Sequence, residues 1–148
     1  MPSIYVATAW RNGHLADNIV KPAAAARGLE VVSTWHDGAP HPDRMPSEDL
    51  DAKPIALVRR IADTNDRDLA SADGVLVIWH HEAGETFVEL RFAMQIGKPV
   101  SYVGPRFVLS AYREGVQRFH YYGDALTWLA YELHLRPSRV FVDDEAAS

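Results

Sequence analysis

Short apolar runs alternate with longer segments of helical periodicity along this chain of 148 residues. The runs are rich in β-branched residues and predict strands at residues 3–9, 29–35, 74–80, 98–104 and 116–122. The middle runs are almost continuously apolar, which is typical of parallel strands buried on both faces. The pattern therefore predicts a doubly wound α/β fold with a five-stranded parallel sheet and three α/β/α layers, as one domain over residues 1–148.

The helix predicted before the third strand follows a long polar loop, residues 36–54. It has Pro54 in its first turn and runs to about Ser71. Asn65 falls in the middle of its apolar arc, and such a lone polar residue either pairs with a backbone group or has a function. The apolar residues of this arc are predicted to face the sheet: Ile55, Val58, Ile61, Ala62 and Leu69.

The segment GETFVELRFAMQIGKPV, residues 84–100, predicts a helix with an acid among apolar positions. At about 100° per residue, Glu89 projects between Ala93 and Ile96, on an apolar arc that also includes Val88 and Phe92. One interpretation is a capping box, in which Thr86 is the N-cap and Glu89 satisfies a backbone donor. The other is functional, because this helix follows the third predicted strand directly, and ligands of such sheets bind outside the carboxyl ends of the strands.

Composition narrows the classes of function. A net charge of -5, with acids and bases interspersed, argues against a nucleic-acid duplex as partner. The absence of cysteine excludes disulfides, a thiol nucleophile and thiolate metal ligands. No apolar run approaches the roughly 18 residues that cross a bilayer, and the first residues lack the basic start of a signal peptide. A cytoplasmic protein without a membrane partner is expected.

Histidines gather in the two segments that follow the second and third predicted strands. Their spacing matches no compact metal-ligand motif, so no metal site is expected. The other role for such residues is contact with a small ligand. The candidates are His80, directly after the third strand, and His36 with Asp37, after the second.

The sequences IYVATAW, DLASAD, GETFVELRFA, GKPV and VGPR occur in this order. Together they resemble the nucleoside 2-deoxyribosyltransferase superfamily, which includes the 2'-deoxynucleoside 5'-phosphate N-hydrolases. The resemblance covers about residues 3–111 and is most specific in the helix that holds Glu89. It implies a flavodoxin-like fold and an enzyme without a cofactor. Its glutamate, here Glu89, would attack the anomeric carbon of a nucleoside and displace the base, as a carboxylate does in retaining glycosidases.

The resemblance also implies roles for residues around Glu89. Tyr5 matches an aromatic residue that orients the glutamate in relatives. Trp10 aligns with a residue that lines the base pocket. Gly84 and Thr86, at the start of the helix of Glu89, are expected to contact the substrate.

The chain departs from the family pattern in two places. Asn65 occupies the position of a usual aspartate, and an amide can hold hydroxyls or a base edge but cannot donate a proton as a carboxylic acid does. Asp66, Asp68 or a group on the long loop is then the candidate acid for the leaving base. Ala83 replaces an aspartate of the transferases, which argues against a strict transferase.

Two matches favour the nucleotide-hydrolase branch. Arg11 corresponds to a residue that holds a 5'-phosphate, and Ser110 to a serine that reaches a phosphate in the neighbouring subunit, which implies a homo-oligomer with shared active sites. The alternatives are a solvated charge for Arg11 and a helix N-cap for Ser110. The predicted function is cleavage of the N-glycosidic bond of a nucleoside or its 5'-monophosphate, with transfer of the sugar to water or another base. The competing hypothesis is a module that binds a nucleotide without catalysis.

Overall fold

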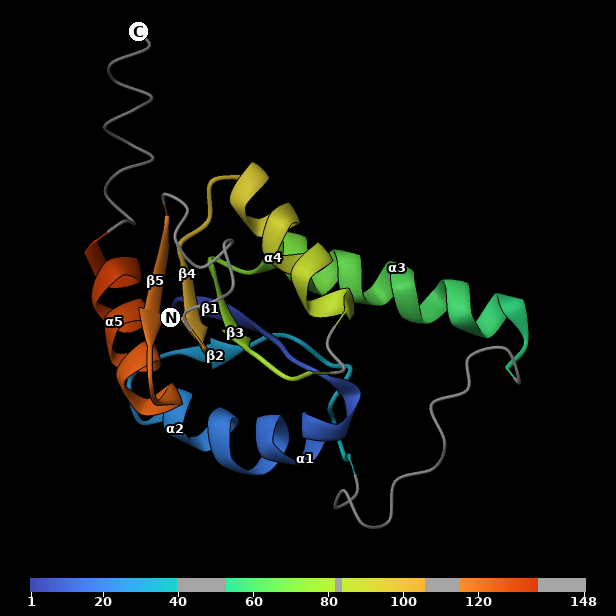
Figure 1. Cartoon of the computed structure of the whole chain (residues 1–148), viewed down its shortest axis with the longest axis horizontal. Coiled ribbons are helices and arrows are strands. Elements are labelled where there is room, and N and C mark those ends of the chain that lie inside the picture. The colour runs from blue at the N-terminus through green and yellow to red at the C-terminus, as the bar shows by residue number, and fades with distance from the viewer. Residues whose placement is uncertain (40–52, 82–83, 106–114, 136–148) are drawn as a thin grey trace, which may run out of the picture.

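Five parallel strands form one sheet in the order β2-β1-β3-β4-β5 (Figure 1). The computed structural model describes residues 1–39, 53–81, 84–105 and 115–135. The strands are β1 (Ser3–Ala7), β2 (Glu30–Val31), β3 (Gly74–Ile78), β4 (Val100–Val103) and β5 (Val116–Phe119). This order is that of flavodoxin-like folds, so the predicted fold class is confirmed. Each strand lies within a predicted run and is shorter than it.

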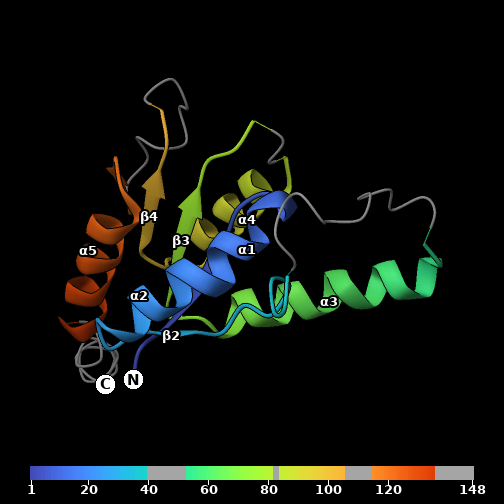
Figure 2. The same ribbon diagram turned by 90° about the horizontal axis from the view of Figure 1, so that it is seen from below.

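Helices cover both faces of the sheet, which explains the continuous apolar runs (Figure 2). On one face, Ile4, Val6 and Leu76 pack against the helical segment before β2 and the helix after β5. On the other face, Tyr5 and Val77 pack against the helices before and after β3. The helical elements are η1 (Trp10–Asn12), α1 (Gly13–Leu15), η2 (Ala16–Val20), α2 (Lys21–Ala25), α3 (Ile55–Ser71), α4 (Gly84–Gln95) and α5 (Tyr122–Leu135).

The helical segment after β1 changes its hydrogen-bonding pattern along its length. A 3₁₀ turn, η1, leads into the single turn α1, and the π-helical turn η2 separates α1 from α2. Pro22 lies at the start of α2, where it lacks an N–H and its ring crowds the carbonyl four residues earlier. A wider π turn before it relieves that crowding. The segment still presents one apolar stripe to the sheet: Ala16, Val20 and Ala24.

α3 extends well beyond the sheet (Figure 1). Its 17 residues span about 25 Å, whereas the five residues of β1 span about 17 Å. Leu69, in the last turns, is buried, but Ile55 and Ile61 are 66% and 38% exposed. The prediction that the whole apolar arc of this helix faces the sheet is therefore wrong, because the first half of the helix lies beyond the edge of the sheet.

In the part of the chain described, no helix combines the length and apolar character needed to span a membrane.

Candidate active site

The side chains of Tyr5 and Glu89 meet between β1 and α4. Tyr5 lies in the middle of β1 and has no exposed surface, while Glu89 is half-buried in the second turn of α4. Tyr5 Oη donates a hydrogen bond to Glu89 Oε1 at 2.8 Å. Two residues that are 84 positions apart in the chain are thus joined by their side chains.

The start of α4 does not have the geometry of a capping box at Thr86. The helix begins at Gly84, so Thr86 is already inside the first turn, and its side chain is buried. A capping box requires the threonine at the N-cap, outside the helix. Glu89 therefore lies one turn further along the helix than that interpretation needs, and its carboxylate accepts a hydrogen bond from Tyr5.

The buried face of α4 differs from the predicted one. Thr86, Leu90 and Ala93 are buried, whereas Phe92 and Ile96 are 38% and 43% exposed. The predicted arc through Phe92 and Ile96 is therefore wrong. Glu89 lies next to the true buried stripe in the helical projection, which places its carboxylate at the border between the core and solvent.

The last turns of α3 bring further carboxylates to this site. Burial is the main cause that raises the pKa of Tyr5 above its usual value, followed by the charge of Glu89 and the hydrogen bond to it, and then by the charges of Asp68 and Asp66. The phenol consequently stays protonated and acts as a donor. Asp68 Oδ2 in turn accepts hydrogen bonds from Thr34 N at 3.1 Å and Thr34 Oγ1 at 2.5 Å, which tie α3 to the segment after β2.

Asn65 and Asp66 lie on α3 just before Asp68. Asn65 is half-buried and Asp66 is exposed. The charge of Asp66 is the last of the causes that raise the pKa of Tyr5. Both residues stay candidates for the roles predicted for them.

Aromatic side chains follow the carboxyl ends of β1 and β2. The ring centroids of Trp10 and Trp35 are 6.4 Å apart, and Trp35 Nε1 donates to the carbonyl of Val6 at 2.8 Å. Lys53 Nζ lies 5.8 Å from the centroid of the Trp10 ring, within cation–π range. Arg11, next to Trp10 in η1, is exposed. Sequence reasoning missed Lys53, and nothing in its local pattern marks it, because the contact joins it to Trp10, which is distant in the sequence.

The remaining predicted residues occupy different positions. The rings of His80 and His81, which follow β3, are stacked with centroids 4.3 Å apart. His36 has no exposed surface, and its neighbour Asp37 is half-exposed. Gly84 is the first residue of α4, while Ser110 and Ala83 lie outside the described residues.

The geometry is suited to nucleophilic or electrostatic catalysis by a carboxylate. A protonated phenol holds one carboxylate oxygen of Glu89, which restricts the rotamer of this side chain. The pair lies at the face of the sheet where α3 and α4 approach β1. A sugar carbon that becomes cationic could be stabilised or attacked by such a group.

No protein-family model matches this chain, and no curated protein sequence matches it. The chain is similar in structure to a 2-deoxyribosyltransferase from the psychrotolerant bacterium Bacillus psychrosaccharolyticus, which is described as a biocatalyst for nucleoside synthesis. The TM-score is 0.64 at 15% sequence identity, over 88% of this chain and 95% of the other. The chain therefore has the fold of a 2-deoxyribosyltransferase over most of its length.

Proposed function

We propose that this protein cleaves the N-glycosidic bond of a nucleoside or of its 5'-monophosphate, with Glu89 as the nucleophile. The observation that carries the proposal is the hydrogen bond of 2.8 Å between Tyr5 Oη and Glu89 Oε1, in a chain with the fold of a 2-deoxyribosyltransferase. The bond fixes the carboxylate by a buried donor that is protonated at neutral pH. This is what a group that must attack one carbon atom requires.

In the proposed reaction, a Glu89 carboxylate oxygen forms a bond to C1' while the bond from C1' to the base nitrogen breaks. The base leaves with the electron pair of that bond and takes up a proton. Water or a second base then attacks C1' while the bond from C1' to Glu89 breaks; the attacking group gives up a proton to the group that protonated the leaving base, and the Glu89 carboxylate is released. The two displacements retain the configuration at C1', as in retaining glycosidases.

The proton for the leaving base is proposed to come from the carboxyl groups at the end of α3. Asp66 is exposed and can exchange protons with solvent, whereas Asp68 is held by Thr34. Asn65 is proposed to hold the substrate through its amide, since it cannot act as an acid. Arg11, exposed after β1, is proposed to meet a 5'-phosphate.

The alternative is a module that binds a nucleotide without turning it over. The observation that favours it is Asn65, which stands where an acid would be expected for catalysis. Incubation with a panel of deoxynucleosides, ribonucleosides and their monophosphates distinguishes the two. We expect free base to appear by chromatography. Thermal stabilisation by a nucleotide with no base released would instead identify a binding module.

The same assay with a second free base separates transfer from hydrolysis. A transferase yields the exchanged nucleoside, while a hydrolase yields only sugar and free base. Ala83, in place of the aspartate that transferases tend to carry, favours hydrolysis. Formation of the exchanged nucleoside as main product would contradict that preference.

We also propose that the protein forms a homo-oligomer. The first half of α3 leaves the apolar side chains of Ile55, Leu57 and Ile61 at 66%, 38% and 38% exposure, an arrangement that a second copy of the chain would cover. We expect sedimentation velocity to give a mass of at least two chains. A monomer at high protein concentration would contradict this and would require each active site to be complete within one chain.

A further inference from the structure

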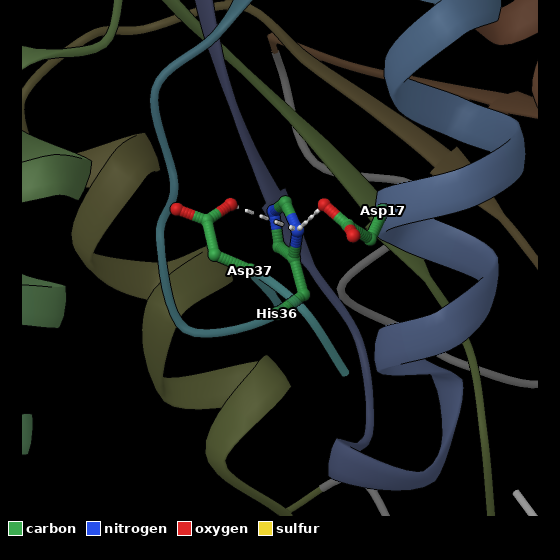
Figure 3. Close-up of side chains that lie close together, drawn as sticks. All are labelled: Asp17, His36 and Asp37. Carbon is green, nitrogen blue, oxygen red and sulfur yellow. Dashed lines mark ion pairs between the residues drawn. The ribbon is translucent and has the colours of Figure 1, made fainter. Parts of the chain in front are cut away.

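A second group of polar side chains lies on the opposite face of the sheet from Glu89. Asp17 projects from η2, and His36 and Asp37 lie in the turn that follows β2; all three point toward one another (Figure 3). His36 Nδ1 is 3.7 Å from Asp17 Oδ1 and 3.9 Å from Asp37 Oδ1. The three donor atoms lie within 4.8 Å of one another. A nitrogen and two carboxylate oxygens thus face one small volume.

The imidazole of His36 is buried with one nitrogen unsatisfied. The side chain has no exposed surface, and Nδ1 has no hydrogen-bond partner in the described part of the chain. The carboxylates are too far away for a hydrogen bond, whose usual limit is about 3.2 Å. A buried polar atom without a partner is uncommon in native proteins and points to a group that completes the site.

The other ring nitrogen is held in the way that metal-binding histidines are held. His36 Nε2 is 2.8 Å from Ser33 Oγ, and this buried hydroxyl oxygen also accepts from the backbone N–H of Val6 at 3.1 Å. With two lone pairs, Ser33 Oγ can accept from both, so Nε2–H can donate to it while Nδ1 presents a lone pair. A histidine ligand usually donates its second N–H to an oxygen acceptor, which fixes the tautomer and the orientation of the ring.

Asp17 and its helix are also positioned by the turn after β2. Asp17 Oδ2 accepts from the backbone N–H of Gly38 at 3.2 Å, which leaves Oδ1 directed at His36. The turn after β2 can lie this close to the helical segment because residue 13 in α1 is a glycine: a Cβ added there would lie 2.9 Å from Ala39 Cβ. The carboxylate and the imidazole are therefore held in place by separate contacts.

Lys21 supplies positive charge to this cluster. Its Nζ is 3.5 Å from Asp37 Oδ1 and 3.9 Å from Asp17 Oδ1, and its side chain is 47% exposed. A half-exposed lysine can turn into solvent at little cost, since exposed ion pairs contribute less than about 1 kcal/mol. The two carboxylates can thus exchange this monovalent cation for a divalent one.

We propose that Asp17 Oδ1, His36 Nδ1 and Asp37 Oδ1 bind a divalent transition-metal ion, with Zn²⁺ as the best match. An imidazole with carboxylates suits Zn²⁺ better than Mg²⁺ or Ca²⁺, which prefer oxygen donors alone. Donors held at about 2.1 Å from a metal ion lie about 3.0–3.4 Å apart. The two distances from His36, 3.7 and 3.9 Å, exceed this by about half an ångström, and the two carboxylate oxygens, which lie within 4.8 Å of each other, would approach by at most about 1.8 Å.

Ion binding would fix the turn after β2 to the helical segment after β1. Trp35, the neighbour of His36, contacts its ring edge-on at 5.0 Å between centroids and also lies next to Trp10. The ion would therefore hold the aromatic pair that follows the carboxyl ends of β1 and β2.

Isothermal titration of the full chain with ZnCl₂ tests the proposal, with Co²⁺ absorption as a second measurement of the ligand set. We expect one Zn²⁺ per chain, and at least roughly tenfold weaker binding in Asp37→Asn, which removes a ligand at a half-exposed position. Lys21→Met should bind Zn²⁺ more tightly, because the competing ammonium is gone. MgCl₂ should bind more weakly than ZnCl₂.

Asp63→Asn is the matched control, because Asp63 is an exposed acid on α3 away from the cluster, and it should bind Zn²⁺ as the original chain does. Thermal unfolding without metal verifies that Asp37→Asn and Lys21→Met are folded. Equal Zn²⁺ affinity in the original chain and Asp37→Asn would overturn the proposal. So would an equal loss in Asp63→Asn, because scattered surface acids would then account for the binding.

Discussion

Glu89→Gln is expected to lower the rate of base release on the order of a thousandfold or more. Glutamine has the shape of glutamate, and its amide oxygen can still accept from Tyr5 Oη, so the local packing is kept. It lacks the negative charge that stabilises a cationic sugar and is a poor nucleophile toward C1'. The initial rate of free-base release, measured by chromatography with the best substrate of the panel, tests this.

Glu30→Gln is the control for that experiment, because it makes the same chemical change at an exposed position of the edge strand β2. It should leave the rate unchanged. Glu89→Ala adds a second measurement: azide or formate should restore part of the base release, since a small anion can occupy the space of the removed carboxylate. Rates near the original in Glu89→Gln would show that this carboxylate is not the nucleophile.

The sheet could be predicted because its strands are buried on both faces and appear as continuous apolar runs. The residue at which β2 ends could not be predicted in this way. The predicted run continues to Trp35, but only Glu30 and Val31 form the strand. Beyond it, the Ser33 hydroxyl and the Trp35 indole bind the backbone of Val6 in place of strand carbonyls and amides. The pattern of apolar residues cannot show whether backbone groups or side chains make the hydrogen bonds to the neighbouring strand.

The candidate site was predictable in part. Glu89 stood out as an acid beside apolar positions, and the structure joins it to Tyr5, the partner that the family resemblance implied. The buried arc of α4 was misplaced, because Phe92 and Ile96 are as apolar as the buried Leu90 and Ala93, so periodicity alone could not choose between the faces. The role of the site is still a prediction.

The Asp17–His36–Asp37 cluster could not be found by motif spacing. Metal motifs in sequence compare residues that are close along the chain, whereas Asp17 comes from η2 and the other two follow β2. What brings them together is the parallel pairing of β1 and β2 and the close approach permitted by Gly13. Such information exists only in the tertiary structure.

Tyr5→Phe is expected to lower kcat by about 10–100-fold, the equivalent of losing one hydrogen bond to a charged group. KM should change little, because Tyr5 is fully buried and reaches the site through its contact with Glu89. The acid limb of the pH–rate profile should move to higher pH, since a carboxylate without its donor is protonated more readily. Steady-state kinetics between pH 4 and 8, as an approximate range, measure all three effects. An unchanged kcat with a raised KM would contradict a positioning role.

The same substitution should alter stability at alkaline pH. The pKa of Tyr5 is raised in the folded chain, chiefly by burial, so the fold favours the protonated phenol. Above about pH 10 the unfolded chain loses this proton and the folded chain keeps it, so the free energy of unfolding falls as pH rises. Tyr5→Phe has no proton to lose here, so its stability should fall less steeply. Urea unfolding of both proteins from about pH 8 to 11 measures the two slopes. Equal slopes would mean that the phenol is not held protonated against Glu89, and the basis for a fixed, charged carboxylate would be lost.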